Sequence, residues 1–522
     1  MLGMMQDWQL RVEHLIDHAA REHGTREIYT KWADGSESRS NWAEVRRDSM
    51  RLARALERLG IRKGDRVASL AMNHAHHLAS WYGVPGAGAI LHTLNPRLFA
   101  DQLEFIVNHA EDRVLFYDAP FRPLVEKMKP FWPGIEHYIC YDNGEFRSLI
   151  EAEDTDFEWE LGDEQDACML CYTSGTTGDP KGVLYSHRSS MLHAMAVVQP
   201  SMFDLSPGSA MLPVVPMFHA AGWGLPWACA ASGCKMVFAT SYEPVNLAEM
   251  MNAEGVTHSA GVPTVWLGLL QYLEASDEKL KTLEQVQIGG SAAPRMVVEK
   301  FMKMGLRVMH AWGMTETSPV GTAGGEPLGW EEMSFDEQVA AKLPQGRALF
   351  GIEMRTVSLD DPAKELPRDG KSAGALQVRG PWVVKRYYKA EQDAVGEGQW
   401  FETGDVGIVH PDGTLQLTDR TKDVIKSGGE WISSVELENA AVGHPAVAEA
   451  AAIGIPDPKW DERPLLVVVL KEGRELTSDG MREFLREKVA KWWIPERIEF
   501  AAEIPHTATG KISKKTLREH FC

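Results

Sequence analysis

The sequence is poor in cysteine and in net positive charge, and each shortage excludes a class of protein. Its six cysteines are widely spaced over 522 residues, so they do not form the dense disulfide framework of a small secreted domain, and a reducing cytoplasm is expected. The formal net charge of −20 opposes binding to nucleic acid and to anionic lipid, so neither partner is predicted. Charged residues interrupt the first 17 positions, which therefore lack the basic and then apolar pattern of a signal peptide.

One long uncharged stretch has to be distinguished from a membrane span. Residues 205–234 contain no Asp, Glu, Lys or Arg, and their number exceeds the roughly 20 residues that cross a bilayer. However, Pro207, Pro213, Pro216 and Pro226, together with glycines, break the stretch repeatedly. We therefore predict a buried strand, loop and helix beside an apolar pocket, and no membrane span.

The chain is too long for one hydrophobic core, so several domains are expected. Up to about residue 312, short apolar runs of strand type alternate with segments of helical period. Examples are the strands at 235–239, 257–262 and 286–290 and the helices at 247–253 and 265–273. This alternation predicts parallel sheets built from βαβ units and covered by helices.

The pattern changes near residue 346. Short strands at 375–378, 400–402, 406–409 and 414–417 are separated by glycine and Asp-Gly turns, which predicts an antiparallel, barrel-like segment. After Arg420 a compact α/β pattern follows. We predict an α/β protein with two domains, bounded as 1–420 and 421–522. The large N-terminal domain would hold two βαβ-type parallel-sheet subdomains and a small β-barrel-like subdomain at about 346–420, and the C-terminal domain would be a small, mobile α+β unit.

The densest chemical signal is a loop directly after an apolar strand at 167–172. Its residues are Thr173, Ser174, Gly175, Thr176, Thr177, Gly178, Asp179, Pro180, Lys181 and Gly182. Glycines let the backbone approach a phosphate closely, the hydroxyls donate hydrogen bonds at any pH, and Lys181 adds a full positive charge. The spacing does not match a Walker A loop, and Pro180 blocks the helix start that such a loop requires. The loop predicts phosphate binding, against the alternative of a flexible surface loop.

Residues 172–183 (YTSGTTGDPKGV) resemble the signature loop of the adenylate-forming superfamily, which comprises acyl-CoA synthetases, nonribosomal-peptide adenylation domains and beetle luciferases. Further segments resemble motifs of that family in the family's order: 289–294 (GGSAAP), 311–317 (AWGMTET), 403–405 (TGD), 419–423 (DRTKD), 426–431 (KSGGEW) and 505–511 (PHTATGK). The resemblance covers essentially the whole chain. Residues 205–431 look most like medium- and long-chain fatty acyl-CoA synthetases and methylmercaptopropionate-CoA ligases.

The resemblance implies a two-step acyl-CoA ligase. A carboxylic acid and ATP would form an acyl-adenylate and release pyrophosphate, and the acyl group would then pass to coenzyme A with release of AMP. Two anions meet in the first step, so positive charge and Mg²⁺ are needed where negative charge accumulates. By resemblance, Lys511 reaches both the carboxylate and the α-phosphate, and Lys181 binds phosphate. Thr315 would bind the α-phosphate, and Glu316 with Thr176 would hold the metal.

The same resemblance implies a nucleotide site in which Trp312 stacks on adenine while Asp405 and Arg420 bind the ribose hydroxyls. Taken alone, Glu316 would be a solvated acid and Trp312 a core residue, but the surrounding motif favours the functional interpretation. The predicted nucleotide-binding residues are Thr173, Ser174, Gly175, Thr176, Thr177, Gly178, Gly290, Ser291, Ala292, Ala311, Trp312, Gly313, Met314, Asp405, Arg420, Lys426, Glu430 and Trp431.

The family alternates between two orientations of its C-terminal domain, because the two half-reactions need different groups at one place. By resemblance, Lys422 or Asp423 is the hinge. Backbone around Gly428 and Gly429 would line the pantetheine tunnel on the CoA side. Relatives with this set of motifs are often homodimers, so a homodimer is expected.

The acyl pocket is predicted from family position to contain no Asp, Glu, Lys or Arg, which favours an acid with an apolar tail. Its candidate residues are His219, Trp223, Trp227, Val262, Thr264, Gly289, Gly290, Met314, Pro319 and Val320. The tryptophans shorten the cavity, whereas the glycines leave room beneath it. A short- to medium-chain aliphatic or methylthio acid such as methylmercaptopropionate is the first choice, and a long-chain or aryl (cinnamate-like) acid is the alternative. His219 flanks the acyl carboxylate by resemblance, although a lone histidine there is more often a core residue.

Other classes of function are also compatible with the sequence. An adenylation enzyme that loads a carrier protein shares these motifs, as do a luciferase-like oxygenase and a non-catalytic sensor of acyl nucleotides. The chain has no carrier domain, and an amino-acid substrate would need an acidic partner for its amine. Cys168 and Cys171 form a Cys-x-x-Cys, but no second pair completes a zinc site, so we predict that both are core residues.

Overall fold

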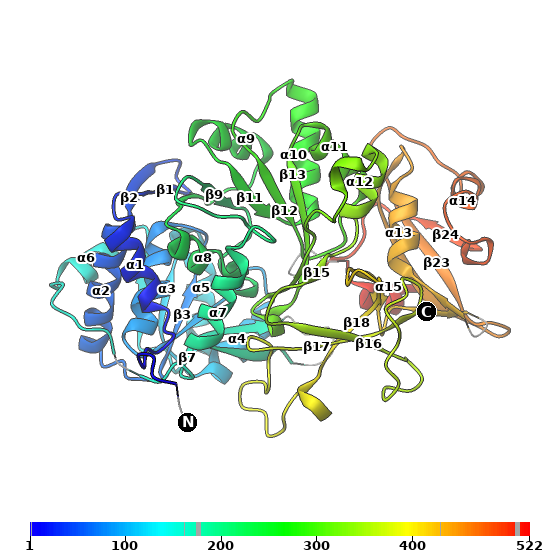
Figure 1. Cartoon of the computed structure of the whole chain (residues 1–522). Helices are drawn as coiled ribbons and strands as arrows, with labels where there is room; N and C mark the ends of the chain where they lie inside the picture. Colours follow the sequence, from blue (N-terminus) through cyan, green and yellow to red (C-terminus); the bar gives the residue numbers. More distant parts are fainter. Residues whose placement is uncertain (2, 161, 174–178, 428–429, 507–511, 522) are drawn as a thin grey trace.

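The computed structural model describes residues 1, 3–160, 162–173, 179–427, 430–506 and 512–521. These residues form four sheets (Figure 1). Two are large and mainly parallel, one is a small antiparallel sheet, and one belongs to a separate C-terminal unit. The predicted α/β fold class is confirmed.

The first large sheet has the strand order β6-β5-β3-β4-β7-β8. Its strands are β3 (Arg66–Leu70), β4 (Ile90–Thr93), β5 (Asp112–Tyr117), β6 (His137–Cys140), β7 (Ala167–Thr173) and β8 (Lys181–Ser186). Five of them are parallel, and β8 runs antiparallel to β7, so that Thr173 faces Lys181 across the pair. The helices of this region are α1 (Glu13–Glu22), α2 (Trp42–Arg58), α3 (Ala75–Gly86), α4 (Ala100–Ala110), α5 (Arg122–Met128), α6 (Glu145–Glu151) and α7 (His187–Val197).

The second large sheet follows the predicted alternation and then departs from it at both edges. Its parallel strands are β9 (Ala210–Pro213), β10 (Lys235–Ala239), β11 (His258–Gly261), β12 (Gln285–Ile288) and β13 (Arg307–Gly313), with α8 (Leu225–Ser232), α9 (Pro244–Ala253), α10 (Pro263–Ser276) and α11 (Arg295–Lys303) between them. The N-terminal strands β1 (Glu27–Lys31) and β2 (Glu37–Asn41) extend one edge, beside β10. The strands β14 (Val320–Ala323) and β15 (Arg347–Ala348) extend the other, and α12 (Phe335–Lys342) lies between them in sequence.

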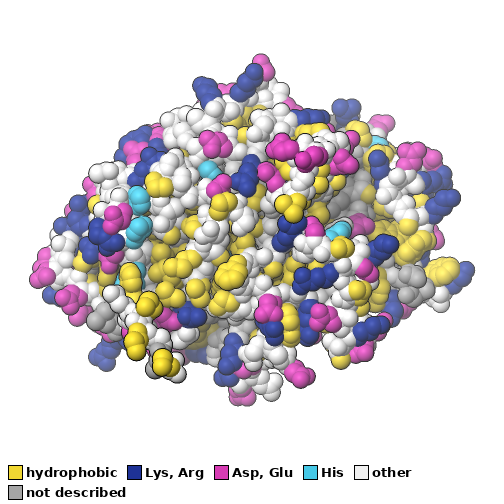
Figure 2. Space-filling model, viewed as in Figure 1, with side chains coloured by type: hydrophobic (Ala, Val, Ile, Leu, Met, Phe, Trp, Pro, Cys, Tyr) yellow, Lys and Arg dark blue, Asp and Glu magenta, His cyan; other side chains and the backbone are white. Residues whose placement is uncertain are grey.

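The uncharged stretch at 205–234 forms β9, a loop, the 3-10 turn η3 (Ala220–Gly224) and α8, and most of its side chains are buried. This arrangement confirms the predicted strand, loop and helix. In the described part of the chain, no helix is long and apolar enough to cross a membrane. Figure 2 shows acidic and basic side chains interspersed over one face of the molecule, without a single dominant sign.

The small antiparallel sheet consists of β16 (Glu353–Val357), β17 (Ala373–Arg379), β18 (Phe401–Val409) and β19 (Leu415–Arg420). The two strands predicted at 400–402 and 406–409 are a single strand, so that expectation was wrong. Gly404, at φ +76°, bulges within β18 instead of ending it, because glycine adopts this left-handed conformation without steric cost.

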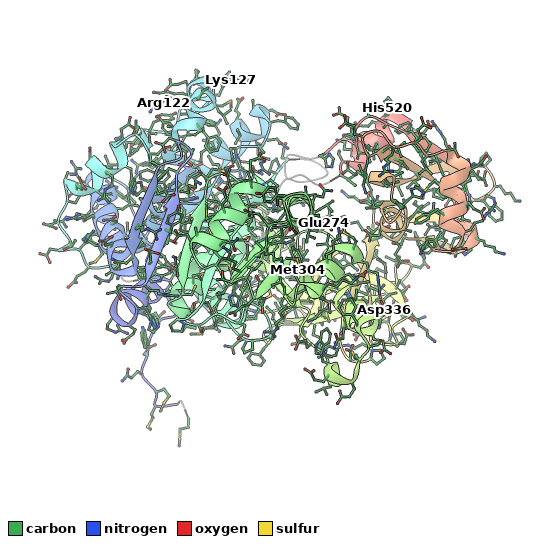
Figure 3. All side chains as sticks on the ribbon, turned by 90° about the horizontal axis from the view of Figure 1, so that it is seen from above. Arg122, Lys127, Glu274, Met304, Asp336 and His520 are labelled. Atoms are coloured by element: carbon green, nitrogen blue, oxygen red, sulfur yellow. The ribbon has the colours of Figure 1, made fainter. Side chains whose placement is uncertain are left out.

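The C-terminal unit carries its own sheet, β20 (Ile425–Ser427), β21 (Glu430–Ile432), β22 (Val447–Asp457), β23 (Asp461–Leu470) and β24 (Arg497–Phe500), with α13 (Ser434–Val442), α14 (Ser478–Arg486) and α15 (Lys514–Phe521). Seen from above, this unit, marked by His520, stands beside the large domain that carries Glu274 and Asp336 (Figure 3). The predicted boundary at 420/421 falls in the turn between β19 and β20.

Candidate active site

The predicted ribose pair comes together at the bulge of β18. Asp405 and Arg420 are partners across β18 and β19, and the Arg420 Nε lies 3.6 Å from the Asp405 carboxylate. The indole Nε1 of Trp312, at the end of β13, donates a hydrogen bond of 2.8 Å to the same carboxylate. Three residues from three sequence motifs thus meet at one point, with Trp312 and Asp405 buried and Arg420 half-exposed.

Two glycines explain why Trp312 sits where it does. A Cβ on Gly321 would lie 2.6 Å from the Trp312 ring, so only glycine lets the indole lie against β14. A Cβ on Gly313 would lie 1.9 Å from the Pro319 carbonyl oxygen, which the backbone N–H of Met314 already contacts at 3.0 Å. The Trp-Gly-Met motif is therefore required by close packing as well as by any ligand.

The next turn, η4 (Thr315–Thr317), holds the predicted α-phosphate and metal residues. The Tyr185 hydroxyl donates to the Thr315 carbonyl at 2.7 Å and fixes this turn to β8. Glu316 is only 7% exposed. Burial raises the pKa of its carboxyl and nearby Asp405 adds to the rise, whereas the Tyr387 hydroxyl and the Lys181 ammonium lower it. The arrangement is a buried carboxylate next to a cation, in a place where a further positive charge would be stabilised.

Tyr387 is a residue of this site that the sequence did not reveal. Its hydroxyl donates to Glu316 Oε1 at 2.8 Å, and the Lys181 Nζ lies 4.9 Å from the centre of its ring. Because the contact joins positions 71 residues apart, no local spacing could have indicated it. Tyr387 connects the end of the predicted phosphate-binding loop, at Lys181, to the predicted metal ligand Glu316.

Several acyl-pocket candidates also lie together. A Cβ on Gly289 would be 2.8 Å from the Trp223 ring, and one on Gly290 would be 3.2 Å from Val262. The indole of Trp223 therefore occupies the space that Gly289 was expected to leave open. Trp227 packs against Trp81 and Tyr82, with ring centroids 5.0 and 4.9 Å away, in the hydrophobic core.

The loop that leads to His219 is held by Asn73, another residue that sequence reasoning missed. The Asn73 side chain donates to the carbonyls of Pro213 and Val215 at 3.0 and 2.9 Å, and its oxygen accepts from the Met217 N–H at 2.7 Å. Asn73 is fully buried, so all three bonds are shielded from water. His219 follows at the start of η3 and is half-buried.

His193 contacts the segments that carry two further acyl-pocket candidates, Val320 and Trp223. Its Nε2 accepts a 3.1 Å hydrogen bond from the Val320 N–H, which follows Pro319, and its ring fills the space beside Gly224, next to Trp223. Burial lowers the pKa of His193 to about 3, so the ring is neutral and Nε2 is free to accept.

At the predicted hinge, the turn at 420–424 is bonded to the C-terminal helix. Arg518 on α15 donates to the Asp423 carboxylate at 2.6 Å and to the Lys422 carbonyl at 3.2 Å. The Lys426 ammonium lies 5.5 Å from the Trp431 ring. The predictions for residues 174–178, Gly428, Gly429 and Lys511 lie outside the described residues, as does the side chain of Glu430. Cys168 and Cys171 are buried free thiols, as predicted for core residues.

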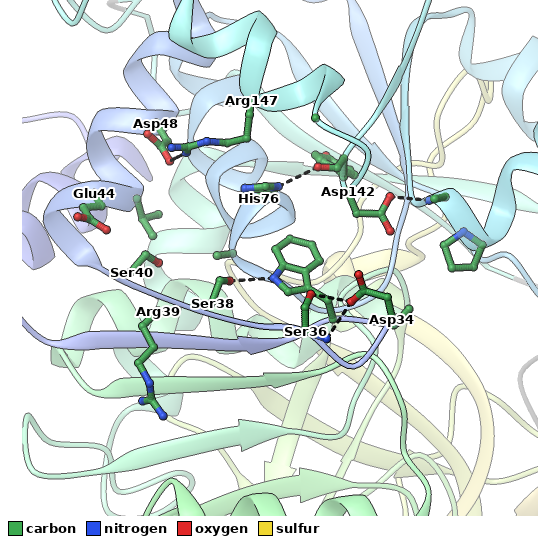
Figure 4. Close-up of a pocket in the computed structure, with 18 of the residues that line it drawn as sticks. Asp34, Ser36, Ser38, Arg39, Ser40, Glu44, Asp48, His76, Asp142 and Arg147 are labelled. Carbon is green, nitrogen blue, oxygen red and sulfur yellow. Dashed lines mark hydrogen bonds and ion pairs between the residues drawn. The ribbon is translucent and has the colours of Figure 1, made fainter.

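A cavity of about 790 Å³ lies elsewhere, between β2, the starts of α2 and α3, and α6 (Figure 4). Its charged groups largely bond to the protein itself: Arg147 donates to Asp48 at 2.8 Å, and Asp142 accepts from the Ala119 N–H at 2.7 Å. None of the predicted site residues is among the described residues that line it, so we do not assign the chemistry to this cavity.

Comparison with known proteins agrees with this geometry. Residues 16–388 match the family described as AMP-binding enzyme, and residues 436–511 match the AMP-binding enzyme C-terminal domain. A 3-methylmercaptopropionyl-CoA ligase from Ruegeria lacuscaerulensis is 45% identical over 535 residues, which cover 100% of this chain and 99% of that protein. A medium-chain-fatty-acid–CoA ligase from Ectopseudomonas oleovorans is 42% identical and covers 100% and 98%.

The fold is likewise similar to a solved structure. The crystal structure of an anthranilate CoA ligase in complex with anthranoyl-AMP superimposes with a TM-score of 0.87 over 99% of this chain and 98% of that one, at 24% identity. With both parts of the family architecture matched and relatives similar along their full lengths, this chain belongs to the AMP-binding enzyme family.

Proposed function

We propose that this AMP-binding enzyme activates a short- to medium-chain acid and transfers it to coenzyme A. In the first step a carboxylate oxygen attacks the α-phosphorus of ATP, the bond from that phosphorus to the β-phosphate oxygen breaks, and pyrophosphate leaves. In the second step the CoA sulfur attacks the acyl carbon, AMP leaves, and the thiol proton passes to water. The observation that carries the proposal is the convergence of Trp312, Asp405 and Arg420 beside a turn that presents Thr315 and Glu316.

Four described side chains would divide the first step between them, and three of these, all except Trp312, carry charge. Asp405 accepts hydrogen bonds from the ribose, with Trp312 fixing the orientation of its carboxylate, and Arg420 adds donors on the same side. Lys181 places positive charge at the phosphates, where charge-assisted contacts are strongest. Lys511, from its motif, neutralises the approach of the carboxylate to the α-phosphate. These groups would make two anions meet in an environment already arranged to receive their charge.

Mg²⁺ fits the residues at this site. Glu316 is a buried carboxylate whose pKa is raised by burial, so a nearby cation would stabilise its charged form. Among the described residues, no group of three or more His, Cys, Asp or Glu side chains could hold a metal ion. A single protein carboxylate such as Glu316 suits Mg²⁺, which usually binds through one or two carboxylates, substrate phosphates and water. When bound, the metal would offset charge on the departing pyrophosphate.

The acid is proposed from the contact between Trp223 and Gly289 and from the relatives. Trp223 fills the space beneath Gly289, which favours a short chain over a long one. Relatives named for 3-methylmercaptopropionate and for medium-chain fatty acids agree with an acid of that size. We propose an apolar aliphatic or methylthio acid such as 3-methylmercaptopropionate as the substrate, with Trp223 setting the upper limit of chain length.

The test is release of pyrophosphate and acyl-CoA from the purified protein with ATP, Mg²⁺ and CoA. The acid panel runs from acetate to dodecanoate and includes methylmercaptopropionate and cinnamate. Turnover that requires CoA and peaks at one short or medium chain length supports the proposal. Release of pyrophosphate without acyl-CoA would point to a carrier protein as acceptor. No turnover with any acid would contradict the proposed ligase activity.

The Trp223→Ala variant tests the chain-length limit separately. Removing the indole should raise the ratio of kcat/KM for dodecanoate to that for butyrate by about tenfold, since it makes room for about two more buried methylenes, each contributing about 0.8 kcal/mol. Trp227→Phe is the control, because Trp227 packs in the core beside Trp81. An unchanged ratio in Trp223→Ala would show that another residue limits the chain.

The sequence-based expectations of a homodimer and a cytoplasmic location are also part of the proposal. Light scattering on the purified protein checks the first, and fractionation of the source cells checks the second.

A further inference from the structure

Lys181 and Glu316 carry opposite charges and interact electrostatically, yet no ion pair within 4.0 Å joins them among the described residues. Tyr387 lies between the two. Its hydroxyl donates to Glu316 Oε1 at 2.8 Å, while its ring faces the Lys181 ammonium at 4.9 Å. A single side chain therefore contacts both charged groups, through two different kinds of interaction.

The backbone holds Tyr387 in this place from both sides. The Val384 N–H donates to the Glu316 carbonyl at 2.7 Å, and the Tyr388 N–H donates to the Gly182 carbonyl at 2.8 Å. Gly182 lies so near that a Cβ there would be 3.1 Å from the Tyr388 Cβ. The segment 384–388 is thus fastened to the metal-side turn at one end and to the phosphate-loop strand at the other.

A direct ion pair between Lys181 and Glu316 would be electrostatically more favourable than the contacts that each makes with Tyr387. Coulomb attraction rises as two charges approach and as water is excluded, and Glu316 is buried. Such a pair would leave Glu316 neutralised before a metal arrives and Lys181 neutralised before a phosphate arrives. The phenol instead gives the carboxylate a neutral hydrogen bond and the ammonium an aromatic face, which are weaker partners. A divalent cation and a polyphosphate can displace both.

We propose that Tyr387 is a positioning residue that keeps Lys181 and Glu316 apart, so that each stays available for the nucleotide and its metal. The inference rests on the proposed function, because the phosphate role of Lys181 and the metal role of Glu316 belong to that proposal. It assigns Tyr387 no contact with the reacting atoms. Its action is to block an ion pair that would close the site against ATP.

The decisive measurement is the dissociation constant of metal-free ATP, determined by calorimetry in the presence of EDTA. Tyr387→Leu removes both the ring and the hydroxyl, so Lys181 should pair with Glu316 and the dissociation constant should rise about tenfold. Adding Glu316→Gln to this variant removes the carboxylate that captures Lys181. The double variant should therefore bind metal-free ATP as tightly as Glu316→Gln alone.

Rescue by a second substitution separates positioning from simple packing. If Tyr387 only fills space, Glu316→Gln cannot restore binding to Tyr387→Leu, and that result overturns the proposal. Wild-type affinity in Tyr387→Leu overturns it as well. The binding assay needs no turnover, so a failure of the proposed function would appear separately, as a wild-type protein that binds ATP but forms no acyl-CoA.

Tyr387→Phe provides a milder variant in case the leucine variant does not fold. The ring remains under Lys181, so the affinity for metal-free ATP should not change. Glu316 loses the hydrogen bond that Mg²⁺ has to displace, so the Mg²⁺ concentration for half-maximal pyrophosphate release should fall about threefold, with kcat at saturating Mg²⁺ little altered. Tyr388→Phe is the matched control, because no hydrogen bond joins the Tyr388 hydroxyl to a described residue of the site. Equal Mg²⁺ dependence in the two phenylalanine variants would overturn the part of the proposal that concerns Glu316.

Discussion

The nucleotide side of the large domain and the C-terminal unit are held in place in different ways. On the nucleotide side, bonds such as Trp312 to Asp405 and Tyr387 to Glu316 join elements far apart in sequence, and glycines allow backbone contact. The C-terminal unit has its own sheet and continues from β19 through the turn at 420–424. The difference supports the proposal of a preformed ATP site in the large domain and of a second unit that reorients as a body.

Lys511→Ala is expected to have the largest effect on activity and to distinguish the two regions by affecting only one half-reaction. Formation of the adenylate should fall at least about hundredfold, because the charge that lets two anions meet is lost. Formation of the thioester from synthetic acyl-AMP and CoA should be little changed. Lys515→Ala is the control, since Lys515 is exposed and pairs only loosely with Glu519 at 3.9 Å. Equal losses in both half-reactions would refute the division of labour between the two regions.

A smaller but still severe effect is expected from Gly313→Ala, which disrupts the close backbone packing on the nucleotide side. Gly313→Ala would place a Cβ 1.9 Å from the Pro319 carbonyl, and a backbone atom cannot move aside as a flexible side chain can. The free energy of unfolding should fall by about 1–3 kcal/mol, and KM for ATP should rise as Thr315 and Glu316 shift. Gly325→Ala, where nothing lies within 4 Å, should leave both unchanged. Chemical unfolding and steady-state kinetics on the two variants make the comparison.

Lowering the pH should reduce the unfolding free energy of the large domain, because His193 is buried in its neutral form. Burial lowers its pKa to about 3, whereas the unfolded chain keeps a value near 6.5, so below pH 6.5 only the unfolded state takes up the proton. The stability that His193 contributes is therefore complete above pH 6.5 and is lost as the pH falls toward 3, by up to about 1.4 kcal/mol per pH unit. The difference in unfolding free energy between wild type and His193→Gln should shrink from pH 7 to pH 5. A difference that stays constant would contradict this account.

The comparison also shows what could be predicted from the sequence and why the rest could not. The strand predicted at 235–239 is β10 to the residue, because an apolar run between helices has one way to be buried in a parallel sheet. The strand β2 (ESRSN) was missed, since it lies at a sheet edge and carries no apolar alternation. Thr315 and Glu316 could be predicted because they stand in one contiguous motif, and the structure places both in the buried turn η4. Tyr387 and Asn73 could not be predicted, because each acts on a segment 71 or 144 residues away.

The smallest effect is expected where the C-terminal unit meets its connecting turn. Arg518→Ala removes the 2.6 Å contact to Asp423, whose side chain is 10% exposed, and should cost the C-terminal unit about 1 kcal/mol. Hydrogen exchange should become faster in α15 and in the turn at 420–424, while β12 and β13 keep their protection, because their backbone pairs with other strands of the second large sheet. Affinity for ATP should be unchanged, in contrast to Gly313→Ala. If exchange instead rose equally in both regions, the two would unfold as one cooperative body, and the contrast between a preformed site and a separable unit would not hold.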